Sequence, residues 1–498
     1  MRLSHCCNTL PPTNNLDIPV IKARSLRTAA FVAIATIMTA IQAGNVDKDL
    51  LDVLLQNGSI TQEQHATLVA KLLDDDQEQA DQPVPSTPII TETLLDEKIA
   101  QQVAVQVEEV APVRANHTSK GFQFETRDGN WQTNLQWRAQ FRYTDPFGGD
   151  PRQLSNFDAP DQSTFENRRL RMKIGGHGYR PWLKYYFEVD LQPTRDTDDS
   201  SSSASARVID WRIDVAKWDW GGIRLGQWKI DYNRERVDSS GRQQFVERSI
   251  VNRVFTIDRQ VGVQLRGHAF KNTRSDLRWY LGAFTGEGRG VRNTDDNLMY
   301  VGRLQWNFLG RDLALKQTDV EFTELPTASL AFGASTTIGS CTRWSSSGCG
   351  NLDGFTSPAD AAPDQFKVEQ AVQEFAYKWR GLSIQQELHH KEITDRVAGI
   401  TSRLTGGYVQ AGYFFHHLYP SIPEQLEFAA RYAYLEEPNQ DDLSFDNERQ
   451  EFTLGANWFF QGHNNKLTFD VSRLRLEDDF IGRNESENRV RLQWDISF

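Results

Sequence analysis

The last eleven residues of the chain alternate between apolar and polar side chains. One face carries Val490, Leu492, Trp494, Ile496 and Phe498, and the other carries Arg489, Arg491, Gln493, Asp495 and Ser497. Because successive residues of a β-strand point to opposite sides, this segment predicts a strand with one apolar face and one polar face. The same alternation recurs upstream, as in a barrel with lipid outside and water inside. The sequence therefore predicts a transmembrane β-barrel in the outer membrane of a Gram-negative bacterium, surrounded by outer-membrane lipid and lipopolysaccharide.

The longest apolar run lies near the N-terminus, at residues 29–43. A helix needs about 20 consecutive apolar residues to cross a membrane, so this run is too short to span. Basic residues precede the run and Ala43 offers a cleavage site, which together indicate a secretory signal peptide over residues 1–43. The lead before the apolar run is unusually long and indicates a misassigned start codon. The mean hydropathy of -0.57 is compatible with a barrel, whose apolar residues are spread along its outward faces.

Residues 44–120 are predicted to form a helical periplasmic segment ahead of the barrel. A helical hairpin is expected over residues 49–74, because leucines recur there at helical spacing and Thr61 with Gln64 forms a capping box. A Pro/Gln/Asp-rich linker follows. An apolar stripe at residues 90–110 fits both a trimeric coiled coil and a loosely helical spacer, and the pattern does not choose between them.

Sixteen segments of residues 121–498 have the character of strands. They are residues 131–143, 165–177, 182–191, 206–217, 222–229, 259–270, 276–285, 298–308, 327–337, 366–380, 382–393, 404–415, 424–436, 449–460, 465–477 and 488–498. Long connections alternate with short ones, as expected for outer loops and periplasmic turns. The connection at residues 309–326 is long although it falls on the periplasmic side, which indicates a misplaced strand there. Barrels of about 16 to 18 strands leave an aqueous channel, so we expect a 16-stranded antiparallel pore.

Parity along each strand separates residues that face the lumen from residues that face lipid. Candidate pore-lining residues are Arg138 and Arg142 on the first strand, Arg169 and Arg171 on the second, and Asp210 and Arg212 on the fourth. Since the formal net charge is -12, we expect the acidic residues mostly in the outer loops and the N-terminal segment. Rings of arginine or lysine concentrate anions and serve as anion and phosphate filters. A basic wall facing an acidic loop would instead give only mild selectivity, and the sequence leaves both possibilities open.

The loop at residues 230–258 is the candidate constriction. It combines five arginines and five acidic residues with apolar side chains such as Phe245, Ile250 and Phe255. Apolar side chains are stabilised by removal from water, so we expect this loop to pack inside the barrel rather than extend into solvent.

Several motifs resemble the phosphate-selective porin O and P family. They are Phe165–Gly175 (FENRRLRMKIG), Leu183–Asp190 (LKYYFEVD), Phe245–Ser249 (FVERS), Arg259–Val263 (RQVGV) and Leu51–Gly58 (LDVLLQNG). The resemblance implies a homotrimer of sixteen-stranded barrels with an arginine ladder leading to a narrow anion site, which is built from an arginine pair, an aspartate and a loop arginine. By motif position these are Arg168 with Arg169, Asp210 and Arg248. Parity puts Arg168 on the face opposite to Arg169 unless a bulge rotates it.

The cysteines and histidines of the chain indicate one disulfide and no catalytic or metal site. Cys341 and Cys349 flank a Ser/Gly-rich loop and are predicted to form one disulfide, because an exported chain meets an oxidising compartment. The pairs His389–His390 and His416–His417 cannot share one site if they lie on strands, since adjacent residues of a strand face opposite sides. The sequence contains no catalytic motif or metal-ligand spacing, so we expect no enzyme, no metal and no cofactor. An outer-membrane hydrolase and a structural tether to the cell wall remain alternatives.

We therefore predict passive diffusion of small anions, phosphate or polyphosphate first among them, through an arginine-lined pore. Strictly phosphate-selective members of the family gather lysines at the mouth and exit of the pore, whereas the outer loops here carry few. A general, weakly selective diffusion porin is therefore the alternative. The terminal Phe498 resembles the signal by which the barrel-assembly machinery recognises its clients, and no nucleic-acid partner is expected.

Overall fold

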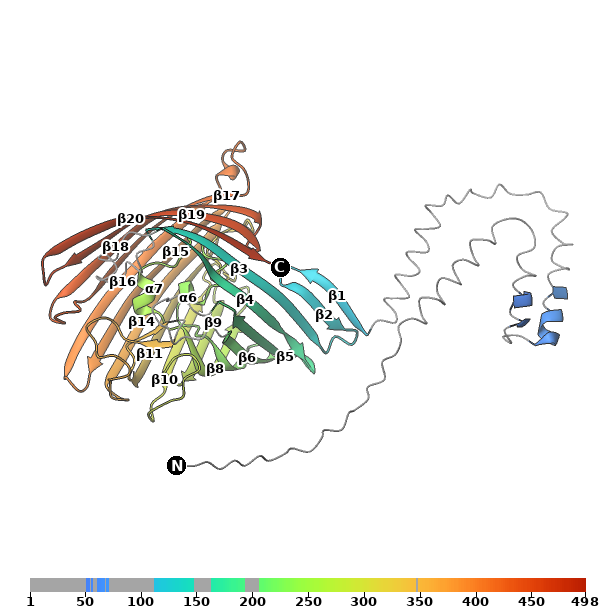
Figure 1. Cartoon of the computed structure of the whole chain (residues 1–498), viewed down its shortest axis with the longest axis horizontal. Coiled ribbons are helices and arrows are strands. Elements are labelled where there is room, and N and C mark those ends of the chain that lie inside the picture. Colours follow the sequence, from blue (N-terminus) through green and yellow to red (C-terminus); the bar gives the residue numbers. More distant parts are fainter. Residues whose placement is uncertain are drawn as a thin grey trace, which may run out of the picture. The chain divides into compact units, whose positions relative to one another are not determined.

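Sixteen β-strands close into an antiparallel barrel in the computed structural model (Figure 1). Each strand pairs with the next along the chain, and β20 pairs with β3 to complete the ring. Each predicted strand overlaps one of these, so the predicted fold is confirmed. The strands are β3 (Gln132–Asp145), β4 (Thr164–Gly178), β5 (Arg180–Asp190), β6 (Arg207–Trp218), β7 (Gly221–Lys229), β8 (Arg259–Ala269), β9 (Leu277–Phe284), β10 (Met299–Trp306), β11 (Thr327–Gly339), β14 (Phe366–Trp379), β15 (Leu382–Asp395), β16 (Ile400–Tyr413), β17 (Leu426–Pro438), β18 (Asp446–Gln461), β19 (Asn465–Asp478) and β20 (Arg483–Ser497).

The chain divides into two compact units, Met1–Gln102 and Val103–Phe498. The predicted signal peptide and the apolar stripe at 90–110 lie outside the residues that the structure describes. Among the described residues, no helix is long and apolar enough to cross a membrane. The described residues are 51–53, 55–56, 61–67, 69–70, 112–146, 163–192, 206–345 and 348–498.

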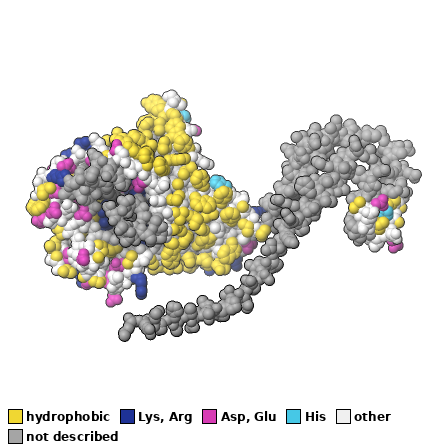
Figure 2. Space-filling model, viewed as in Figure 1, with side chains coloured by type: hydrophobic (Ala, Val, Ile, Leu, Met, Phe, Trp, Pro, Cys, Tyr) yellow, Lys and Arg dark blue, Asp and Glu magenta, His cyan; other side chains and the backbone are white. Residues whose placement is uncertain are grey.

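The two faces of the barrel wall differ in chemistry as alternation predicts. On β20, Leu492 and Trp494 are 40% and 45% exposed on the outer surface, whereas Arg491 and Gln493 are buried inside. Figure 2 shows hydrophobic side chains gathered over the side of the barrel. An apolar outer band suits the hydrocarbon core of a bilayer, and the polar residues face inward.

An additional hairpin precedes the barrel and was not predicted from the sequence. It consists of β1 (Val113–Thr118) and β2 (Gly121–Thr126), and β2 pairs with the first residues of β3, beyond the point where β20 ends (Figure 1). Gly121 is needed at this junction, because its φ is +87° and a Cβ there would lie 2.2 Å from the backbone oxygen of Leu135. The barrel sheet therefore begins earlier than the predicted boundary at residue 121.

The N-terminal unit contains the predicted helical residues. Residues 51–53, 55–56, 62–67 and 69–70 are helical. The Thr61 backbone N–H donates to Gln64 Oε1 at 3.0 Å, and the Gln64 backbone N–H donates to Thr61 Oγ1 at 3.3 Å. These two reciprocal hydrogen bonds confirm the predicted capping box.

A cluster of buried apolar residues lies inside the barrel. It combines inward residues of several strands with the loop at 230–258, which carries the short helices α6 (Arg234–Val237) and α7 (Val251–Phe255). Phe255 is 0% exposed and Phe245 is 1% exposed. The expectation that this loop packs inside the barrel therefore agrees with the structure.

A second long loop, at residues 340–365, packs beside the first. It contains the two-stranded hairpin β12 (Arg343–Ser345) and β13 (Gly348–Gly350). Cys341 and Cys349 form a disulfide across the base of this hairpin, with their Cα atoms 5.7 Å apart. Cys341 and Trp344 lie in the same apolar cluster as residues of the helix α7.

The long connection at residues 309–326 also folds inward. Leu313, Thr318 and Asp319 are at most 4% exposed. The backbone N–H of Gln244, in the loop at 230–258, donates to Gln317 Oε1 at 2.7 Å. The length of this turn therefore reflects its packing in the lumen, and the suspicion of a misplaced strand was wrong.

Candidate functional site

The loop at residues 230–258 leaves the wall at β7, returns at β8, and docks on the strands β15 to β19. Four carboxylates of that wall accept hydrogen bonds from the loop at 2.6 to 2.9 Å. They are Glu387 (from the Glu235 N–H), Glu427 (from the Gln244 amide), Glu451 (from the Ile250 N–H) and Asp470 (from the Val246 N–H). The loop therefore covers acidic groups of this wall and supplies donors that buried carboxylates require.

Two glycines of the wall make room for the loop. A Cβ at Gly406 would lie 2.9 Å from Phe255 Cε2, and a Cβ at Gly455 would lie 3.0 Å from Phe245 Cδ1. Glycine inside a strand commonly marks a place where another segment approaches closely. The two phenyl rings consequently seat against the strand backbone.

A cavity of about 840 Å³ remains between the loop and the strands β3 to β8. Its charged lining consists of ten lysines and arginines and four carboxylates. The basic residues are Lys120, Arg138, Arg171, Lys173, Lys184, Arg212, Arg224, Lys229, Arg242 and Arg259, and the acidic residues are Glu188, Asp210, Asp214 and Asp231. The lining also includes His177, Pro181 and Ser497 at the ends of strands next to short turns, which places the cavity in the periplasmic half of the lumen.

All six arginines that line this cavity lie within 4 Å of a carboxylate. The contacts are Arg138–Asp495 (3.0 Å), Arg171–Glu188 (3.1 Å), Arg212–Asp214 (3.4 Å), Arg224–Asp214 (2.5 Å), Arg242–Asp238 (3.1 Å) and Arg259–Asp210 (2.6 Å). Two lysines donate to uncharged oxygens instead: Lys173 to Gln136 Oε1 at 3.2 Å, and Lys229 to the backbone oxygen of Asp238 at 3.1 Å. Lysines therefore belong to the basic lining of the cavity in addition to the predicted arginines.

Arg168 faces the lumen together with Arg169. The pairing of β3 with β4 shifts register between Gln140 and Phe141, which oppose Arg169 and Asn167, so Arg168 is the extra residue of a β-bulge. A β-bulge changes the direction of the side chain at the extra residue. Arg168 and Arg169 can therefore face the same side of the wall although they are adjacent in the sequence. Arg168 Nε donates to Glu247 Oε1 at 2.9 Å, and Arg169 Nη2 donates to the same oxygen at 3.4 Å.

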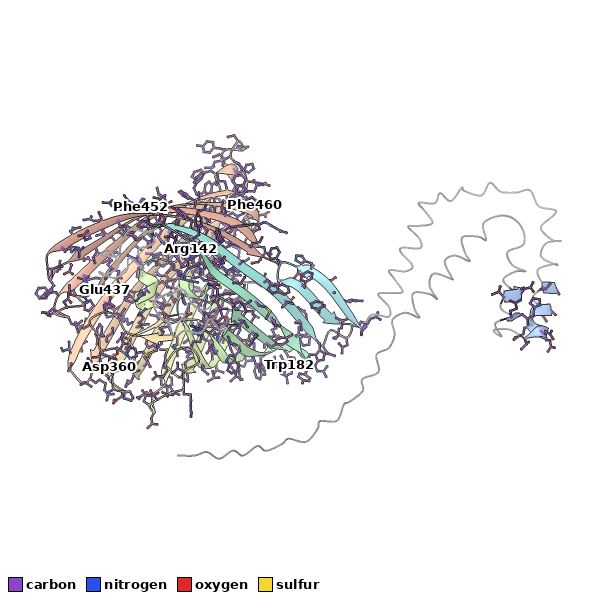
Figure 3. All side chains as sticks on the ribbon, viewed as in Figure 1. Arg142, Trp182, Asp360, Glu437, Phe452 and Phe460 are labelled. Atoms are coloured by element: carbon purple, nitrogen blue, oxygen red, sulfur yellow. A yellow bond between two sulfur atoms is a disulfide. The ribbon has the colours of Figure 1, made fainter. Side chains whose placement is uncertain are left out.

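Arg142, which is labelled in Figure 3, is buried and reaches the same carboxylate from β3. Its Nη2 lies 2.9 Å from Glu247 Oε1. Glu247 belongs to the loop at 230–258, so the loop carries a carboxylate onto three arginines of the wall. We call Arg142, Arg168, Arg169 and Glu247 the outer cluster, because the chain of β3 runs from the periplasmic cavity toward the long outer loops as it passes from Arg138 to Arg142.

Asp210 and Arg248 make their hydrogen bonds with groups other than Arg168 and Arg169. Asp210 accepts from Arg259 Nε at 2.6 Å and therefore orients Arg259. Arg248 is 7% exposed and donates to the loop's own backbone oxygens, those of Glu235 at 2.9 Å and Asp238 at 2.8 Å. Burial, reinforced by the nearby charge of Arg236, lowers the pKa of Arg248 to about 10. Arg248 thus holds the loop in shape, and Arg142 takes the third place beside the arginine pair.

Three other predicted pore-lining residues lie in the cavity between the loop and β3 to β8. Arg138, Arg171 and Arg212 line the cavity, as parity predicts, and the Arg212 guanidinium also lies 4.3 Å from the centroid of the Tyr186 ring. Arg259 was missed, because it is the first residue of β8 and has the parity of the outward residues Val263 and Leu265. Its Nε donates to Asp210 Oδ1 at 2.6 Å, a contact distant in the sequence that no local pattern signals.

One histidine prediction needs correction. His389 is buried and His390 is exposed, as alternation requires. His416 and His417, however, belong to the short helix η2 (Phe415–His417) in the turn between β16 and β17, so the strand argument does not apply to them.

A family model described as phosphate-selective porin O and P matches residues 141–495, which is more than half of the chain. No curated protein matches. Among solved structures the chain is similar to the outer membrane channel DcaP of Acinetobacter baumannii, with 12% identity, a TM-score of 0.48, and coverage of 75% of this chain and 99% of that chain. It is also similar to OmpT of Vibrio cholerae, with 10% identity, a TM-score of 0.47, and coverage of 74% and 97%. An anion-selective porin from Comamonas acidovorans has 10% identity, a TM-score of 0.46, and coverage of 74% and 99%.

Proposed function

The chain belongs to the phosphate-selective porin O and P family, and on that premise we propose that it conducts small anions, phosphate or polyphosphate first among them, by passive diffusion. As a member of this family it is a channel of the Gram-negative outer membrane and not an enzyme. The observation that carries the proposed selectivity is the lining of the cavity between the loop and β3 to β8, where ten basic residues face four carboxylates.

Anion selectivity would arise from the positive electrostatic potential of a cavity whose lining has more basic than acidic residues. Charges of one sign in a narrow, low-dielectric passage raise the local concentration of counter-ions. The loop contributes to this imbalance, since it docks on carboxylates of β15 to β19 and leaves the opposite wall open to the cavity. Guanidinium groups suit phosphate, because their planar fork can bond two oxygens at once.

A general, weakly selective porin is the second candidate, and one observation favours it. Every one of the six arginines that line the cavity lies within 4 Å of a carboxylate. Guanidinium groups that are already paired attract anions less strongly than unpaired ones, so the field of the lumen would be weaker than the count of arginines suggests.

The two candidates are separated by single-channel recordings in planar bilayers. If the protein is an anion channel, its reversal potential in a salt gradient should show selectivity for chloride over potassium. Added inorganic phosphate should then block the chloride current in a saturating manner. A large conductance that rises linearly with salt, with weak selectivity and no phosphate block, would identify the general porin. The homotrimer and recognition by the assembly machinery through Phe498 remain predictions.

A further inference from the structure

A single carboxylate oxygen in the lumen receives three guanidinium groups. Glu247 Oε1 lies 2.9 Å from Arg142 Nη2, 2.9 Å from Arg168 Nε and 3.4 Å from Arg169 Nη2. A second carboxylate, Glu166, lies farther away, 3.5 Å from Arg142 and 3.9 Å from Arg168. This convergence of donors on one oxygen is the geometry with which arginines bind an oxyanion such as phosphate or a carboxylate.

Two of the three arginines are held in place without Glu247. Arg142 donates from Nε and Nη2 to Gln493 Oε1 at 2.9 Å and 2.7 Å. Arg169 donates from Nη1 to Gln140 Oε1 at 2.8 Å. Their guanidinium groups would therefore keep their positions if the glutamate side chain moved away, and the site would remain ready for another oxyanion.

The backbone of Glu247 is fixed, whereas its side chain is partly accessible. The preceding N–H, that of Val246, donates to Asp470 at 2.9 Å, and Arg431 donates to the backbone oxygen of Glu247 at 3.0 Å. The side chains of Glu247 and Arg168 retain 23% and 19% of their exposure. A rotation of the glutamate side chain would thus expose the three arginines without moving the loop.

The glutamate is ionised in this position. Burial acts to raise the pKa of Glu247, but the charges of Arg168, Arg169 and Arg142 outweigh burial and hold the pKa well below its ordinary value. Glu247 therefore competes with solutes as an anion near neutral pH.

We propose that Glu247 is a tethered ligand: its carboxylate occupies an oxyanion site formed by Arg142, Arg168 and Arg169, and a permeating oxyanion displaces it. This proposal rests on the proposed anion channel and adds a mechanism for release. A solute in a site of three arginines would leave slowly, whereas a carboxylate on the loop can take its place at once. Conduction requires binding that is strong enough for entry and weak enough for exit, and an internal competitor weakens net binding without removing the arginines.

The test compares Glu247→Gln, Glu247→Asp and wild type in planar bilayers, with inorganic phosphate titrated into chloride. Because hydrogen bonds to charged groups are the strong ones, the phosphate concentration for half-block should fall about tenfold or more in Glu247→Gln. Glu247→Asp keeps the charge but shortens the side chain by one methylene. Its half-block concentration should therefore lie between those of wild type and Glu247→Gln. If Glu247 acted only through its negative charge, Glu247→Asp would have the same half-block concentration as wild type. That result would overturn the tethered-ligand mechanism.

The matched control is Glu321→Gln, which removes the same charge from the connection at residues 309–326. The Glu321 side chain is 65% exposed. This control should keep the half-block concentration of wild type. An unchanged or raised half-block concentration in Glu247→Gln would refute the proposal while leaving an anion-selective reversal potential intact. Failure of the proposed function is distinguishable, since it would appear as a lack of chloride selectivity in wild type and in every variant.

Discussion

Removal of the Phe255 ring should release the loop at 230–258 from the barrel wall. Phe255 is 0% exposed, its ring centroid lies 5.0 Å from that of His389, and it fills the space above Gly406. Truncation of a buried phenylalanine to alanine typically costs about 3–5 kcal/mol, from lost burial and the cavity left behind. The ring belongs to the loop and makes no ladder hydrogen bond, so the cost falls on docking of the loop rather than on closure of the barrel.

That cost converts into a population of released loops. Since each 1.4 kcal/mol is a factor of about ten, Phe255→Ala should increase the ratio of undocked to docked loops about 140-fold to 3,700-fold. An undocked loop no longer covers the carboxylates of β15 to β19. We therefore expect a wider, noisier pore with weaker anion selectivity.

The assay is single-channel conductance with current-noise analysis, together with the reversal potential in a potassium chloride gradient. Phe452→Ala is the matched control, because Phe452 is 49% exposed on the lipid face of β18 and its loss leaves the lumen unchanged. The reasoning is refuted if folded Phe255→Ala channels show the conductance, noise and reversal potential of wild type and of the control.

Three further predictions follow from particular contacts. Arg168→Ala removes the most accessible arginine of the outer cluster, and the phosphate concentration for half-block should rise about tenfold in a chloride-current titration. Cys341→Ser opens the disulfide that closes the hairpin of β12 and β13, which by chain entropy costs about 2–3 kcal/mol locally, so flicker in single-channel records should increase while the heat stability of the barrel changes little. Because the lowered pKa keeps Glu247 charged until the pH falls well below its ordinary value of 4.5, the difference in reversal potential between wild type and Glu247→Gln should persist from about pH 7 to pH 5 and should vanish only in stronger acid. Loss of that difference near pH 6 would contradict the assigned ionisation.

The strands and their faces could be predicted from local patterns, because a strand repeats every two residues and the lipid selects its outer face. Arg138, Arg171 and Arg212, which parity assigns to the lumen, line the cavity between the loop and β3 to β8. Alternation failed where the backbone departs from its regular period. Arg168 faces inward through a bulge between β3 and β4, and Arg259 is turned inward at the start of β8.

The partners of the charged groups could not be predicted from parity. Motif position assigned Arg248 to the anion site, but its guanidinium binds backbone oxygens of its own loop. Asp210 pairs with Arg259, and Glu247 takes the central place among the arginines. Parity tells which side of the wall a side chain occupies, and the distance between charges across a lumen depends on how the loop folds.

The sequence by itself determined the barrel, its sixteen strands, the inward packing of an apolar loop and the family, since each of these depends on neighbours within a few residues or on a contiguous motif. Only the tertiary structure decided the electrostatics of the pore. The loop at 230–258 binds carboxylates of β15 to β19 that lie far away in the sequence, and it presents Glu247 to arginines of β3 and β4. Charges act through space rather than along the chain, so their balance in the lumen is fixed only when the barrel has closed and the loop has docked.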